Sequence, residues 1–470
     1  MASKSVLNSE NLKALGAERL ADLLMEVATG DAATKRRLRL ELAAAESPRK
    51  LAADLSKRLA ALAAGKTFIG WRTLKGLVAE LSALRRLIEE PLAAAEPGEA
   101  LEVMWAFLDL ADGLLERTSD TSGAVLDIFR EAARGLATLV ERAQPLPERL
   151  VADLGRAVLG NGYGQADGVI PELASALGPA GLDALRQLLT EAGAKAEKPA
   201  LRVRKTSRWR RGRRLERDLV ARRVRTDIVQ RALLDIADAT GDVDAYIALQ
   251  SKRSDAASVA AIARRLIDAG RFEAALSAID GVRGQPAAEL LGLRAEALDR
   301  LDRADEAQSC RLAGFHRALD AGLLRAYLKR LPDFDDIEAE EAALDFAWQS
   351  GDADRALDFL VRWPALERAA ALVVEQSTRL TADDDLFLLA AAKLGPRYPL
   401  AAMVVLRKLI DAILMQSRSR DYGRAAEHLS EAEHLAAQVE DFGGFESHAQ
   451  YVAGLQSHFR HRREFWDLAV

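Results

Sequence analysis

The residues best suited to bind charged ligands lie between Leu201 and Arg225. This stretch, LRVRKTSRWRRGRRLERDLVARRVR, holds twelve Lys or Arg and two acidic residues, a net charge of +10 over 25 residues. Arginines contact phosphate groups and a tryptophan can stack on an exposed base, so the chemistry fits nucleic acid or an acidic partner. The candidate contact residues are Arg202, Arg204, Lys205, Arg208, Trp209, Arg210, Arg211, Arg213 and Arg214.

The same basic stretch also fits an interaction inside the chain. Residues 1–200 hold 25 basic and 28 acidic residues, a net charge of −3, whereas residues 226–470 hold 29 and 41, a net charge of −12. A basic helix could pack on the acidic C-terminal half, or form a solvated face that Trp209 anchors. The pI near 5.9 argues against a dedicated nucleic-acid-binding protein. We therefore favour the internal interaction and keep nucleic acid as the alternative.

A glycine-rich loop covers residues 160–168 (GNGYGQADG). Such a loop could cradle a phosphate group or expose backbone to a ligand. It lacks the GKS or GKT ending of a phosphate-binding loop, and no β-strand is expected before it. A connection between two helices, with several residues at positive φ, is the alternative that we favour.

Two histidines have the spacing of metal ligands. His458 and His461 are three residues apart, which places them on one helical face. A zinc site needs more ligands than two, and the neighbouring residues Arg460, Arg462 and Arg463 would repel a cation. We expect surface or packing histidines and no metal.

Motifs for catalysis are missing from the sequence. It has no GxSxG, no phosphate-binding loop and no dinucleotide fingerprint. Cys310, next to Arg311, is a weak case for a nucleophile, because one arginine does little to activate a thiol. We expect no enzyme, no catalytic residue and no cofactor.

The elements that position these residues are expected to be helices throughout. Ala, Leu, Arg and Glu dominate the composition, and all four favour helix. Leu51, Leu55, Leu59 and Leu62 recur at three- and four-residue steps behind a Ser47-Pro48 start, which predicts one amphipathic helix. Further helices are expected over residues 69–90, 98–117, 122–143 and 148–159. The first half, residues 1–192, is therefore predicted to be an all-α domain.

A turn pattern recurs in the second half. Gly241, Gly270, Asp302, Gly351 and Asp421 each lie where one helix is expected to end and the next to begin. Glycine suits the left-handed position that ends a helix, and we expect it at Gly270 and Gly351. The first two gaps, 29 and 32 residues, approach the tetratricopeptide period of about 34 residues. We predict a helical-hairpin solenoid, tetratricopeptide-like, over residues 226–470.

Parts of the sequence resemble known families. Residues 398–402 (YPLAA), 406–411 (LRKLID) and 422–429 (YGRAAEHL), with the tail from His448 to Trp466, resemble the tetratricopeptide-like region of bacterial SWIM zinc-finger proteins. Residues 11–42 resemble the start of an uncharacterised proteobacterial all-helical family. The zinc finger itself is absent, because it needs several cysteines and a histidine and the chain has only Cys310. The resemblance therefore does not imply zinc-finger DNA binding.

These observations predict three segments: an N-terminal helical domain over 1–192, a linker with the start of the basic helix over 193–225, and the repeat domain over 226–470. One cysteine excludes a disulfide within the chain and suits a reducing compartment. No signal peptide and no membrane-spanning run is expected, so the expected location is cytoplasmic. Helical repeats offer long surfaces for peptides or helices, which favours a scaffold or adaptor that binds a protein partner.

Overall fold

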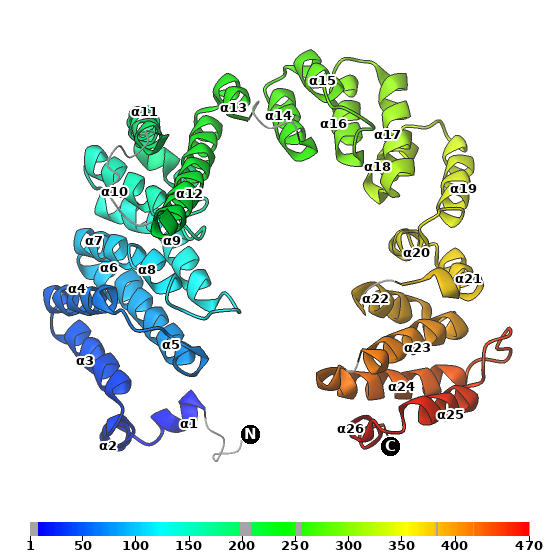
Figure 1. Ribbon diagram of the computed structural model, residues 1–470, viewed down its shortest axis with the longest axis horizontal. Coiled ribbons are helices and arrows are strands. Elements are labelled where there is room, and N and C mark those ends of the chain that lie inside the picture. The colour runs from blue at the N-terminus through cyan, green and yellow to red at the C-terminus, as the bar shows by residue number, and fades with distance from the viewer. Residues whose placement is uncertain (1–7, 198–207, 251–254, 382–383, 417, 470) are drawn as a thin grey trace. The chain divides into compact units, whose positions relative to one another are not determined.

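The structure is a computed structural model that describes residues 8–197, 208–250, 255–381, 384–416 and 418–469. These residues form an all-α fold, and the one β-type contact among them is an isolated bridge between Ile69 and Thr118. The chain divides into two compact units, Met1–Lys252 and Arg253–Val470. Within each unit, helices pack mainly on helices that are near in the chain, the arrangement of a helical-hairpin solenoid (Figure 1).

Unit 1 contains helices α1 to α13. Their bounds are α1 Ser9–Lys13, α2 Ala17–Ala28, α3 Ala32–Glu46, α4 Pro48–Ala64, α5 Trp71–Leu87, the π-helical turn η1 Ile88–Leu92, α6 Ala93–Ala95, α7 Pro97–Leu108, α8 Ala111–Leu115, α9 Ala124–Ala143, α10 Pro147–Leu159, α11 Val169–Glu197, α12 Arg208–Thr240 and α13 Val243–Gln250.

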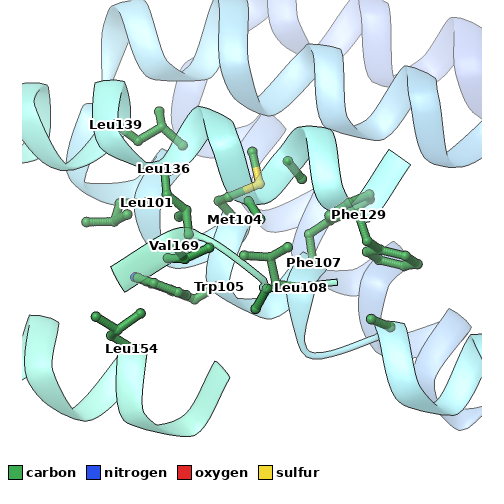
Figure 2. Close-up of a cluster of buried hydrophobic side chains, with 14 of the residues drawn as sticks. Leu101, Met104, Trp105, Phe107, Leu108, Phe129, Leu136, Leu139, Leu154 and Val169 are labelled. Atoms are coloured by element: carbon green, nitrogen blue, oxygen red, sulfur yellow. The ribbon is translucent and has the colours of Figure 1, made fainter. Parts of the chain in front are cut away.

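Helix α7 lies at the centre of the unit 1 core. It is buried around most of its circumference, as expected of a helix that is apolar on all sides. Phe107 of α7 packs on Phe129 of α9, with ring centroids 5.1 Å apart. Figure 2 shows these two rings beside a cluster that also takes side chains from α10 and α11, Leu154 and Val169. The core therefore joins helices from α7 to α11.

Helix α12 belongs to unit 1 through its second half. Val229, Ala232 and Ile236 are buried in the unit 1 core, and the helix packs on α10, α11 and α13. The basic stretch therefore leads into a helix whose described buried residues lie against unit 1, and the division between the units falls after Lys252.

Unit 2 contains helices α14 to α26. Their bounds are α14 Ala256–Asp268, α15 Phe272–Asp280, α16 Ala288–Asp299, α17 Ala304–Ala318, α18 Ala321–Leu328, α19 Asp335–Trp348, α20 Ala353–Arg362, α21 Leu366–Glu375, the 3-10 turn η2 Ser377–Arg379, α22 Asp384–Leu394, α23 Pro399–Met415, the 3-10 turn η3 Ser419–Asp421, α24 Tyr422–Ala436, α25 His448–Phe459 and α26 Arg463–Trp466.

The repeated turns of the second half follow the prediction in part. Gly241 and Gly270 have φ values of 66° and 73°, and Asp302 takes the same left-handed region at 58°. Gly351 does not, so the expectation of a left-handed residue there was wrong. Helix α19 already ends at Trp348, and Asp352 starts α20 by accepting a hydrogen bond from the Arg355 backbone N at 3.0 Å. The turn between α19 and α20 therefore uses the Asp352 cap and no left-handed glycine.

Candidate functional site

The candidate contacts of the basic stretch fall largely outside the described structure. Arg202, Arg204 and Lys205 precede the described part of α12. Arg208, Trp209, Arg210, Arg211, Arg213 and Arg214 lie in the first turns of α12, but their side chains are not among those described. Both interpretations of this stretch, internal and external, therefore stay predictions.

The glycine-rich loop connects α10 to α11 and is occupied by the chain itself. Gly164 and Gly168 have positive φ, as expected. The buried side chain of Gln165 donates to Asp112 Oδ1 at 2.9 Å, and the backbone of Gly162 also bonds this carboxylate. Burial raises the pKa of Asp112, which these hydrogen bonds oppose. The loop joins α10 to α11 and has glycines at positive φ, so the preferred prediction of a connection between helices is confirmed. The carboxylate that the loop surrounds belongs to Asp112 of α8.

The two metal-ligand candidates do not share a helical face. Helix α25 ends at Phe459, so His461 lies beyond it, and the sequence-based placement of the pair on one face was wrong. His458 Nδ1 lies 2.9 Å from the carbonyl O of Gly454 in its own helix. The described residues bring together no group of three or more His, Cys, Asp or Glu that could hold a metal ion.

Cys310 lies half-buried in α17. Burial raises the pKa of its thiol, an effect that the neighbouring Arg294 guanidinium opposes. A raised pKa keeps the thiol protonated near neutral pH, whereas a nucleophilic cysteine needs the thiolate.

Unit 2 has a groove between α24 and α25. Its volume is about 1090 Å³. Residues from two helix faces and the chain end line it: Gly423, Ala426, Glu427, Leu429, Ser430, Glu433, Ala436 and Ala437 of α24 and the residue after it, Phe442, His448, Ala449, Val452, Ala453 and Gln456 of α25, and Trp466, Leu468 and Ala469. Eight of these residues are Gly, Ala or Ser, which leaves open space between helices that touch only sparsely.

Two local signals build the α25 wall. Ser447 and Gln450 form a capping box, in which the Ser447 side chain accepts from the Gln450 backbone and the Gln450 side chain accepts from the Ser447 backbone. The lining residues 449, 452, 453 and 456 then follow the three- and four-residue steps of one helical face. The capping box therefore determines where α25 begins, and the spacing of the lining residues places them on one face of the helix.

Tyr451 ties the α25 wall to α23. Its ring lies under the Arg407 guanidinium, with 4.6 Å between that group and the ring centroid. Its hydroxyl lies 2.9 Å from Asp411 Oδ1 and 3.1 Å from the carbonyl O of Arg407. Arg407 is 7% exposed and also donates to the carbonyl O of Glu446 at 2.8 Å, just before α25 begins.

Burial sets the protonation of this anchor. It raises the pKa of Asp411 and of Tyr451 above their ordinary values, and it lowers the pKa of Arg407. The Tyr451 hydroxyl has one proton and can donate it to only one of its two oxygen neighbours. Both short contacts are hydrogen bonds when the hydroxyl donates to the carbonyl O of Arg407 and accepts from a protonated Asp411 carboxyl. The raised pKa of Asp411 favours that state.

The groove itself is negatively charged. Glu427 and Glu433 are exposed, and neither forms an ion pair with another described residue. Burial, and then the positive charge of Arg407, lower the pKa of His448, so this histidine adds no positive charge near neutral pH. The surface therefore combines apolar lining, small side chains and two exposed carboxylates that form no ion pair within the described structure.

This groove was not predicted from the sequence. Residues 423–437 and 449–456 carry small side chains at helical spacing, which is the signal that was available. That signal is the same as for two helices in close contact. Only the separation of α24 from α25 turns it into an open surface.

The fold places the chain among all-α proteins built from packed helical hairpins. It belongs to a family of unknown function, DUF6880, whose match covers residues 2–468. This agrees with the expected uncharacterised helical family. A comparison with curated proteins found no match. No helix in the described ranges combines the length and apolar character that crossing a bilayer requires.

Proposed function

We propose that this chain is a non-enzymatic scaffold or adaptor of the cytoplasm that binds a protein partner in the α24–α25 groove. The observation that carries the proposal is the groove itself, about 1090 Å³ between two helix faces. Small-molecule sites usually enclose about 300–1000 Å³ and converge a few polar groups on the ligand. This groove is open between two helix faces and has its carboxylates on the exposed lining, which suits a peptide segment.

The negative charge of the groove indicates which kind of partner segment would bind there. Glu427 and Glu433 form no ion pair with the other described residues, so a segment with Lys or Arg beside apolar side chains complements the surface. The apolar side chains would lie between Val452 and Trp466, where small neighbours leave room. A helix presented to a groove with such spacing is a common mode of recognition. The tetratricopeptide-like character of the second half, and its likeness to the helical region of SWIM zinc-finger proteins, are part of this proposal.

A substitution that fills the groove tests the proposal. Ser430 is exposed in the α24 wall, and Ser430→Trp places a large ring there. Ser309 is an exposed serine of α17 outside the groove, so Ser309→Trp is the matched control. Native protein, purified from its own cells after nuclease treatment, should retain a partner that Ser309→Trp also retains and Ser430→Trp loses. Co-purification of the same proteins with the wild type, Ser309→Trp and Ser430→Trp would contradict the proposal.

Nucleic acid stays the second candidate because of the +10 charge over residues 201–225. Arg210, Arg211, Arg213 and Arg214 changed together to Glu separate the two candidates. Nucleic-acid binding would weaken steeply with salt, with a log–log slope of about −0.7 to −0.9 per phosphate contact, and this variant would lose it. Retention of a nuclease-resistant partner by the same variant supports the groove.

A further inference from the structure

A second concave site lies in the first part of unit 2 and has the opposite charge. It has a volume of about 930 Å³. Ala256 of α14, the loop residues Gly281, Val282, Arg283, Gln285 and Ala287, Ala288 of α16, Arg317 and Ala318 of α17, and Arg355 of α20 line it. Three arginines from separate segments therefore meet at one pocket, and none of the lining residues that the structure describes is acidic. This occurs in a half of the chain whose net charge is −12.

The positive charges of the pocket are poorly neutralised. Arg283 is exposed and forms no hydrogen bond or ion pair with the other described residues. Arg317 donates to the side-chain amide oxygen of Gln285, which is uncharged. Arg355 Nη1 lies 3.4 Å from the carbonyl O of Arg317, and its Nε is 3.8 Å from Asp352 Oδ2. The Asp352 carboxylate also caps α20, where it accepts from the Arg355 backbone N.

The backbone adds to the positive potential. Helix α16 begins at the pocket, and its N-cap residue, Ala287, has no side chain that could accept from the first-turn N–H groups. The amide dipoles of a 12-residue helix place a partial positive charge at this end. Glu289, the acidic residue of the same turn, is not among the lining residues. The pocket thus collects three guanidinium groups and a helix N-terminus around a lining of Ala, Val and Gly.

We propose that this pocket binds a small phosphorylated molecule with two or more negative charges. Guanidinium groups bind phosphate oxygens through paired, charge-assisted hydrogen bonds, and the three arginines offer several such pairs. The volume lies within the range of small-molecule sites. The described lining residues include no aromatic side chain on which a nucleic-acid base could stack, so a small anion fits the pocket better than a nucleic-acid strand.

Arg283→Gln is the sharpest test, because this side chain has no described contact to lose and the variant should fold as the wild type does. Arg300→Gln is the matched control, since Arg300 is exposed at the opposite end of α16. Binding of pyrophosphate to the full chain is measured by titration calorimetry at constant ionic strength, with chloride as the reference anion. We expect saturable binding by the wild type and by Arg300→Gln. Loss of one guanidinium should weaken it about tenfold or more.

The outcomes separate clearly. Saturable binding that weakens in Arg283→Gln and in Arg355→Gln, but not in Arg300→Gln, supports the pocket. Orthophosphate should bind more weakly than pyrophosphate, since it engages fewer guanidinium groups. Absence of saturable binding by the wild type would overturn the proposal, and so would equal affinity in Arg283→Gln and wild type. Neither result bears on the α24–α25 groove, whose partner assay is independent.

Discussion

Tyr451→Phe tests whether the anchor between α23 and α25 holds the groove open. The substitution keeps the ring under Arg407 and removes the hydroxyl that lies 2.9 Å from Asp411 Oδ1. The half-buried Asp411 carboxyl then loses a hydrogen-bond partner. Loss of a buried hydrogen bond of this kind costs about 1–3 kcal/mol. The free energy for local opening of α25 should fall by that amount.

Hydrogen exchange measures this local opening directly. A fall of about 1–3 kcal/mol accelerates exchange of the α25 amides by about 5- to 150-fold. Amides of α16, far along the chain, serve as the internal reference. Tyr327→Phe on α18 is the control variant, because no hydrogen bond of the Tyr327 hydroxyl is found among the described residues. Unchanged exchange of α25 in Tyr451→Phe, or equal acceleration in Tyr327→Phe, would refute the reasoning.

Two further predictions concern the turns and the pH dependence. Gly270→Ala should lower the free energy of unfolding by about 1 kcal/mol because Gly270 has a φ of 73°, whereas Gly351→Ala should change it little; equal thermal shifts in the two variants would show that φ does not decide the effect. Burial raises the pKa of Asp411, so the folded state keeps this proton where the unfolded chain has lost it, and the stability that it contributes is lost as pH rises above about 4. Asp411→Asn stays neutral, so in urea unfolding it should gain stability relative to the wild type as pH rises from about 4 to 7, and parallel stability curves would exclude a raised pKa.

The helical fold could be predicted from local patterns. Leu51, Leu55, Leu59 and Leu62 were expected to share one face, and all four are buried in α4, which begins at Pro48 as predicted. The same logic was less accurate over residues 98–117. Helix α7 ends there at Leu108 and α8 starts at Ala111, a break that no glycine or proline marks.

Periodicity also does not reveal what covers an apolar face. Leu15, Leu24 and Val27 are apolar residues of the helical N-terminal stretch, yet they are 49%, 47% and 66% exposed. The chain there forms two short helices, α1 and α2, and their apolar side chains find little cover within the described structure. Helical periodicity identifies the apolar face of a helix, but that face is buried only where another helix packs on it.

The two candidate sites could not be predicted from local sequence patterns, because each depends on residues that are distant in the chain. The α25 wall of the groove is held to α23 by contacts of Tyr451 with Arg407 and Asp411, residues 44 and 40 positions earlier in the chain. The arginine pocket brings Arg283, Arg317 and Arg355 together from three separate segments. The run of arginines over 201–225 could be recognised from the sequence, because a contiguous run is visible without the fold.

The most direct test of the central claim is a site-specific photo-cross-link from the groove. A benzophenone amino acid at Gln456, an exposed residue of the α25 wall, is compared with the same group at Ser309 on α17. The groove account predicts a protein adduct from Gln456 that is absent from Ser309 and disappears when Glu427 and Glu433 are changed to Lys. Adducts of equal yield from both positions, or a Gln456 adduct that survives the charge reversal, would contradict it.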